Sequence, residues 1–204
     1  GLASVPVIDY RNYLDDAPDG DVHIRFHSFS VRERLMNANG TADNYVILVE
    51  DNRHRGNTSS PVYRDVLSQM DRWLTALGKD ASGDPPIVRM RRAKPADLVD
   101  ACWTRDAEPK KVAETPTRAT SGRCEQMYPS ASFPREVAGG SIANDIVKCQ
   151  LKPVARGDYA VTLTGEELVR LKSAFPDGVC DWSKPGVEQQ GLGGTWLKIG
   201  ANEL

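Results

Sequence analysis

The sequence lacks both an excess of charge of one sign and a long apolar run. It has 26 Lys and Arg against 28 Asp and Glu, a formal net charge of -2, which gives no case for nucleic acid or an anionic membrane surface as partner. No uninterrupted apolar stretch is long enough to span a bilayer. The first residues lead into a strand pattern without the basic and apolar segments of a targeting signal. With 40% hydrophobic residues, the chain has the composition of a globular protein.

The sequence also lacks the Cys-x-x-Cys pairs that are typical of zinc sites. Its four cysteines all lie from position 102 onward, with no histidine near them. An even number of cysteines among Gly- and Pro-rich loops favours two disulfides and an oxidising compartment, either outside the cell or in a periplasm. Of the pairings, we expect the sequential one, Cys102 with Cys124 and Cys149 with Cys180. The alternative is four unpaired buried thiols.

The most informative segment that is present runs from residue 44 to residue 77. A buried-strand pattern at 45–49 ends in polar residues, and His54 follows within five positions. Pro61 then opens a segment with apolar residues at helical spacing. A histidine on the loop that leaves the carboxyl end of a strand occupies the place where open α/β sheets carry reactive groups. The alternative is a solvated loop histidine.

A similar strand and helix precede this segment. Residues 5–14 have a strand pattern and lead into a loop with four aspartates, broken by proline and glycine. The helix that follows can be capped by Ser28 or Ser30 and ended by Gly40 in a left-handed turn. The chain therefore has the order strand, acidic loop, helix, strand, histidine loop, helix.

This order resembles the C-terminal third of an α/β-hydrolase, in which the triad acid follows one strand and the histidine follows the next. The resemblance implies that His54 takes the proton of a serine while a carboxylate holds its ring. Asp21 has the best spacing to the following helix, and Asp16, nearer the strand end, is second. Asp15 and Asp19 stay open, and each of the four can also be a solvated turn carboxylate.

Other polar residues near this segment have weaker claims. His23 and His27 alternate with apolar residues in an extended pattern, which puts both on one polar face without further ligands, so we expect no metal. We also expect no cofactor. Arg53 and Arg55 flank His54 and can recognise a carboxylate on a substrate, although solvated surface arginines are the more common case.

The composition changes after Leu77. We expect residues 1–78 to form the C-terminal part of an α/β-hydrolase core, with its last strands and helices. Residues 79–204 then form a loop-rich, partly helical extension that disulfides hold and that packs on the core. Within it we expect a short helix at 95–103, an extended covering segment at 105–123, and a helix at 164–175 with a capping box of Thr164 and Glu167. Trp182 and Trp196 are expected anchors of the tail.

Longer stretches carry a second resemblance. Residues 142–153 and 175–187, together with Asp21-Val22-His23 and Arg32-Glu33-Arg34-Leu35, resemble the C-terminal region of a family of secreted bacterial α/β-hydrolases, largely an uncharacterised-domain family. The likeness covers most of residues 5–197. More distantly, the layout is similar to the tannase/feruloyl-esterase and 3-hydroxybutyrate-oligomer hydrolase families. In tannases a cysteine adjoins the catalytic histidine, whereas here arginines flank His54.

No Gly-x-Ser-x-Gly nucleophile elbow occurs in the sequence; the nearest approach, around Ser141, lacks the second glycine and follows the histidine. We therefore expect the serine on an N-terminal fragment or chain of the same precursor, of which this chain is the C-terminal piece. The expected function is a secreted serine hydrolase acting on a small-molecule or oligomeric carboxylic ester. An amidase or acylase of the same fold, or a non-catalytic binding module held by disulfides, is the alternative.

Overall fold

The computed structural model describes residues 2–58, 60–118, 121–159 and 161–190. Within them the chain divides into two units, one reaching up to Phe133 and the other beginning at Pro134. The composition change that marks a boundary near residue 78 in the sequence therefore falls inside the first unit. None of the helices in the described part is both long enough and apolar enough to cross a membrane.

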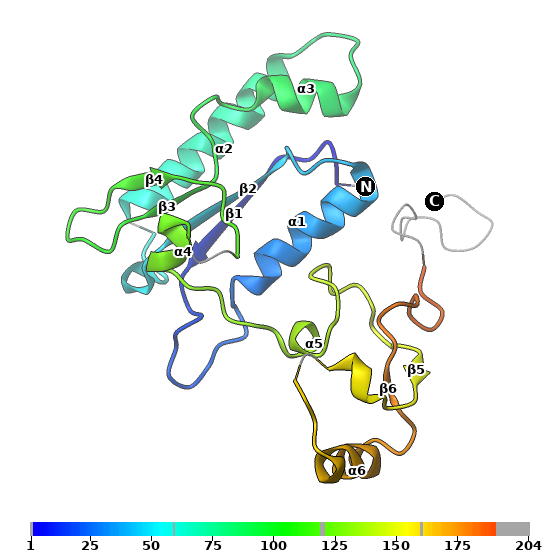
Figure 1. Ribbon diagram of the computed structural model, residues 1–204. Coiled ribbons are helices and arrows are strands. Elements are labelled where there is room, and N and C mark those ends of the chain that lie inside the picture. Colours follow the sequence, from blue (N-terminus) through cyan, green and yellow to red (C-terminus); the bar gives the residue numbers. More distant parts are fainter. Residues whose placement is uncertain (1, 59, 119–120, 160, 191–204) are drawn as a thin grey trace. The chain divides into compact units, whose positions relative to one another are not determined.

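The first unit is built on a four-stranded sheet with the order β1-β2-β3-β4 (Figure 1). β1 (Val7–Asn12), β2 (Tyr45–Glu50) and β3 (Ala101–Trp103) are parallel, and β4 (Lys111–Ala113) is antiparallel to β3. Both strands expected near the start of the chain are confirmed. The unit is thus a mixed α/β structure around a largely parallel sheet.

β2 is buried on both faces, and its alternating side chains contact different helices. Val46 and Leu48 pack with apolar residues of α2 (Pro61–Lys79) and α3 (Pro86–Ala93). Tyr45, Ile47 and Val49 pack against Leu35 of α1 (Phe26–Asn39) and the segment of α4 (Arg123–Met127). A strand covered on both sides needs a continuous apolar run, which this one has. Figure 1 shows α1 on one side of the sheet and α2 with α3 on the other.

The start of α1 differs from the expectation. Ser28 and Ser30 do not cap the helix; they lie inside it, and the helix begins at Phe26 with no side-chain cap of its own. The backbone N–H of Arg25 instead donates to the carboxylate of Asp15, at 2.9 Å. A carboxylate ten residues away thus satisfies a free donor at the helix start. The expected end is confirmed, because Gly40 has a φ of 67° and its N–H donates to the Met36 carbonyl.

The expected helix at 95–103 is wrong. Only one turn forms, from Pro95 to Leu98, and residues 101–103 become β3. The reason lies in Asp100, whose carboxylate accepts the Ile47 N–H at 2.8 Å and pairs with Arg32 at 2.7 Å. These contacts bring the following residues beside β2, where Ala101 and Cys102 pair with Leu48 and Val49.

The second unit contains short elements and one longer helix. They are α5 (Pro134–Val137), β5 (Leu151–Lys152), the 3₁₀ turn η2 (Arg156–Asp158), α6 (Gly165–Ala174) and β6 (Val179–Cys180). The capping box of Thr164 and Glu167 is confirmed. The indole N–H of Trp182 donates to the Ala138 carbonyl at 2.6 Å, whereas Trp196 lies outside the described residues.

Both disulfides have the sequential pairing. Cys102 bonds to Cys124 across 22 positions and Cys149 to Cys180 across 31, so each unit contains one of them. Cys102 lies on β3 and Cys124 on α4, so the first disulfide attaches the segment after β4 to the sheet. This agrees with the expectation of a covering segment held by a disulfide.

Candidate functional site

His54 lies on the turn that leaves the carboxyl end of β2. The 3₁₀ turn η1 (Asn52–His54) begins after Asp51, whose side chain accepts the Arg53 N–H at 2.8 Å. The His54 carbonyl accepts the Asn57 N–H at 2.8 Å, and the intervening Gly56 has a φ of 72°. The left-handed backbone conformation at this position closes the turn and favours glycine. The histidine is half-buried at the end of the sheet.

A cavity of about 540 Å³ lies against His54. Trp103 and Ser60 line it, and its remaining apolar wall consists of Pro61, Val62, Ala107 and Pro109. Its charged lining residues are Asp65, Glu108 and Lys111. Mostly apolar cavities with a few polar groups are typical of small-molecule sites. A larger cavity, of about 630 Å³, lies in the second unit, but no histidine lines it.

Contacts from Arg53 and Arg105 hold the loop that walls this cavity. Arg53 Nη2 donates to the carbonyls of Arg105 and Asp106, at 2.9 and 3.1 Å. The Arg105 guanidinium lies over the rings of Tyr13 and Tyr128, at 5.0 and 4.8 Å from their centroids. Arg53, expected as a substrate-binding residue, is therefore engaged in holding the loop. Lys111 is a cation that lines the cavity and that the sequence pattern did not single out.

Asp21 reaches the histidine loop but pairs with a different histidine. Its Oδ1 lies 2.6 Å from His23 Nδ1, and it also accepts the His23 N–H at 2.7 Å. These two hydrogen bonds hold the pKa of Asp21 below its usual range. Its Oδ2 lies 3.5 Å from Arg55 Nη1, next to His54 in the chain. No side chain in the described part of the chain hydrogen-bonds to the His54 ring.

The other three aspartates of the acidic loop have different surroundings. Asp15 accepts backbone N–H groups of Arg25 and Ala131, and burial raises its pKa. Asp16 is exposed and lies 3.5 Å from Arg105. Asp19 is exposed in a turn. Asp15 thus has a structural role, and of the three loop aspartates that remain, Asp21 alone touches the histidine loop.

Glu50 is a carboxylate near His54 that the sequence pattern did not reveal. It is the last residue of β2, is 1% exposed, and accepts hydrogen bonds from the hydroxyls of Tyr10 and Ser60. Burial raises its pKa, and the charge of His54 opposes this. The signal in the sequence was a glutamate that directly ends a fully apolar strand, a position that also fits a solvated strand end.

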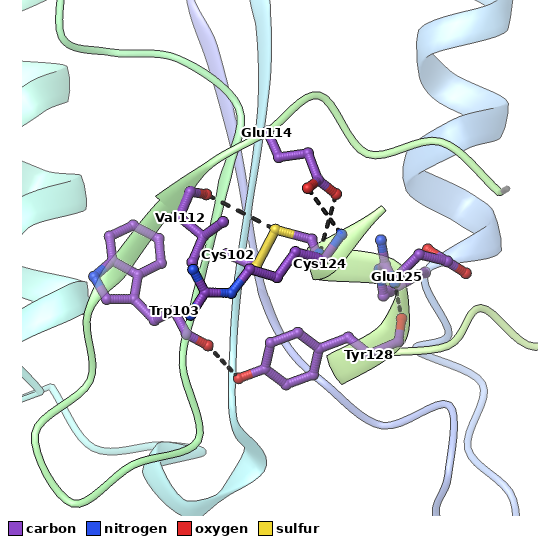
Figure 2. Close-up of a disulfide and its surroundings, with 9 residues drawn as sticks. Cys102, Trp103, Val112, Glu114, Cys124, Glu125 and Tyr128 are labelled. Atoms are coloured by element: carbon purple, nitrogen blue, oxygen red, sulfur yellow. Dashed lines mark hydrogen bonds and ion pairs between the residues drawn. A yellow bond between two sulfur atoms is a disulfide. The ribbon is translucent and has the colours of Figure 1, made fainter. Parts of the chain in front are cut away.

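Figure 2 shows the disulfide of the first unit, which adjoins Trp103, a residue that lines the cavity. Next to Cys102, the Trp103 carbonyl accepts the Tyr128 hydroxyl at 2.6 Å. The Glu114 carboxylate accepts the backbone N–H groups of Arg123 and Cys124 at the start of α4. Because the sulfur bridge and these hydrogen bonds fix β3 to α4, the Trp103 indole is held where it lines the cavity.

Comparison with known proteins identifies a family. The model of a tannase-like family of unknown function (DUF6351) matches residues 1–191. No curated protein and no solved structure matches the chain significantly. The family match covers nearly the whole length and includes the acidic loop, the histidine loop and all four cysteines.

Proposed function

This chain belongs to the tannase-like family of unknown function, and we propose that it carries the histidine and the carboxylate of a serine hydrolase that cleaves carboxylic esters. The observation that carries the proposal is the place of His54. It is a half-buried imidazole at the carboxyl end of parallel strands, facing a cavity of about 540 Å³. Reactive groups of α/β enzymes are found at that edge of the sheet.

In the proposed reaction, His54 acts first as general base and then as general acid. A serine hydroxyl gives its proton to the imidazole as its oxygen attacks the ester carbonyl. The imidazolium returns that proton to the alcohol, which leaves. His54 then takes a proton from water, whose oxygen attacks the acyl-serine ester, and returns it to the serine oxygen as the carboxylic acid is released. The cavity beside Trp103 has room for one substituent of the ester.

Asp21 is the proposed triad acid. Among the loop aspartates it is the one that touches the histidine loop, through Arg55, and its side chain is only 16% exposed. Asp16, the second candidate, is 59% exposed and faces Arg105. In the resting structure Asp21 pairs with His23. Exchange of His23 for His54 on the same carboxylate completes the triad in this proposal.

The serine is proposed to come from another part of the same precursor, docked on β1. Val7 and Tyr13 direct their N–H groups toward the β2 side, at 2.8 Å from the Asn44 and Glu50 carbonyls. The alternation of a parallel strand then directs the backbone groups of Ile8, Tyr10 and Asn12 to the outer edge, which no strand among the described residues covers. Such an edge readily pairs with a further strand.

Export is also part of the proposal. Both disulfides belong to the described structure, one in each unit, and thiols rarely stay oxidised in the cytosol. They support a protein that works outside the cell or in a periplasm.

A serine-reactive phosphonate tests this function on the whole gene product. We expect it to label one serine outside residues 1–204 and to leave the chain of 204 residues unlabelled. This chain has no nucleophile elbow, so His54 has no serine to activate. Paired turnover of p-nitrophenyl acetate and p-nitroacetanilide then separates esterase from amidase. Absence of any labelled serine in the folded gene product would contradict the proposal.

One observation favours a second candidate, a non-catalytic binding module. Asp21 pairs with His23 rather than with His54, as an aspartate in an exposed structural turn also does. In that case the cavity beside Trp103 binds a ligand without changing it. The same phosphonate experiment separates the two candidates, because a binding module leaves every serine unlabelled.

A further inference from the structure

Glu50 is a buried carboxylate that the proposed triad does not use. Its side chain accepts hydrogen bonds from the Tyr10 hydroxyl, from Asn12 Nδ2 at 3.4 Å, and from Ser60 Oγ at 3.2 and 3.3 Å. All three donors are neutral. Burial disfavours the charged form of a carboxyl group that has only neutral donors, and it raises the pKa of Glu50. A positive charge nearby would favour its ionised form.

His54 is the group that can supply this charge. Ser60 connects the two, because it lines the same cavity as His54 and its hydroxyl donates into the Glu50 carboxylate. The turn η1 also folds back against β1, next to the end of β2. The electrostatic effect of His54 on Glu50 is the largest of those that lower the pKa of this carboxyl, larger than that of the Ser60 hydrogen bond.

We propose that Glu50 is a positioning residue for His54, whose carboxylate stabilises the protonated imidazole from the strand side of the site. Its role in turnover rests on the proposed function, in which that imidazolium forms when the serine loses its proton. The coupling between Glu50 and His54 involves residues of this chain only, so it does not depend on the proposed serine. In the proposed completed triad, Asp21 on the loop side holds the orientation of the ring.

Other charged groups surround the histidine, and their surroundings differ from that of Glu50. Asp65 on α2 and the residues Glu108 and Lys111 near β4 line the open cavity, where water screens their charges. The charged neighbours of His54 in the chain are already bonded, Arg53 to Asp51 and Arg55 to Asp21. Glu50 is the carboxylate of this group that is fully buried, so its charge is the least screened.

The test is an NMR titration of the Glu50 side-chain carboxyl carbon in the folded chain. His54→Gln removes a loop side chain and is expected to leave the fold intact. We expect this substitution to move the Glu50 titration to higher pH by about 1 unit. His23→Gln, a matched change at the other histidine of the site, is expected to leave it in place.

In the whole gene product, Glu50→Gln is expected to move the acid limb of the kcat/KM profile to lower pH. Asp71→Asn, at an exposed carboxylate of α2 that does not line the cavity, is the matched control. A Glu50 titration that is the same in His54→Gln and His23→Gln would overturn the proposal, whatever the activity. If Glu50 and His54 are coupled but the whole gene product hydrolyses no ester, the proposed function is contradicted and the proposal for Glu50 stands.

Discussion

The hydroxyl groups of Tyr13 and Tyr128 lie inside the first unit and donate to carbonyl groups, of Pro129 at 2.7 Å and of Trp103 at 2.6 Å. Burial, together with nearby aspartates, raises the pKa of each phenol to about 12. Both rings also pack beneath the Arg105 guanidinium. These two side chains therefore join the cavity loop to the core of the unit.

The raised phenol pKa values predict alkaline destabilisation. Between pH 10 and about 12 the folded state keeps both protons, while the unfolded chain releases them, so the unfolding free energy falls as pH rises. The loss reaches about 2 kcal/mol for each tyrosine. Urea unfolding at several pH values measures it. Tyr128→Phe removes its share of the slope, with Tyr63→Phe as the control for a lost hydroxyl, and an unchanged slope in Tyr128→Phe would contradict the assignment.

At this scale the sequence placed some residues of the candidate site and missed others. His54 could be placed because its signal is local: an apolar run, a polar break and a helix start within 17 residues. The partner of Asp21 could not be predicted, because the same sequence allows an Asx-type contact with His23 and a triad contact with His54. Glu50 was missed because burial by Tyr10 and Ser60 depends on two other elements.

At the scale of elements, helix ends follow local rules where the cap is a neighbour in the chain. Ser60 caps α2, accepting the Tyr63 N–H, and Pro61 occupies its first position, as its sequence indicates. α6 follows its capping box in the same way. By contrast, the start of α1 and the strand β3 depend on Asp15 and Asp100, whose partners lie 10 to 116 positions away. Local patterns do not contain such contacts.

Two glycines at helix ends predict opposite effects of the same substitution. Gly40 ends α1 in the left-handed region, so Gly40→Ala is expected to lower the unfolding free energy by about 1 kcal/mol. Gly78 lies inside the last turn of α2, and a Cβ there meets nothing within 4 Å, so Gly78→Ala is expected to raise it by about 0.5–1 kcal/mol. Thermal unfolding of both variants measures this, and effects of the same sign would contradict the assigned ends.

At the scale of the molecule, the parallel sheet and the two disulfide pairs followed from the sequence, since strand runs and cysteine spacing are visible there. The division after Phe133 did not, because it depends on which loops pack together rather than on composition. β1 illustrates the same limit: its six residues are all half-buried, while all six of β2 are buried. A sheet that presents such an edge fits a site completed by a further segment.

The most direct measurement of the central claim is the turnover of an ester by the whole gene product with each histidine replaced in turn. His54→Ala is expected to lower kcat by about 10³-fold or more, because the serine then has no base. His23→Ala and His27→Ala, matched changes on exposed or half-buried side chains, are expected to stay within a few-fold of the original. Circular dichroism of the three variants checks that each is folded. Full turnover in folded His54→Ala, or equal losses for all three, would contradict the account.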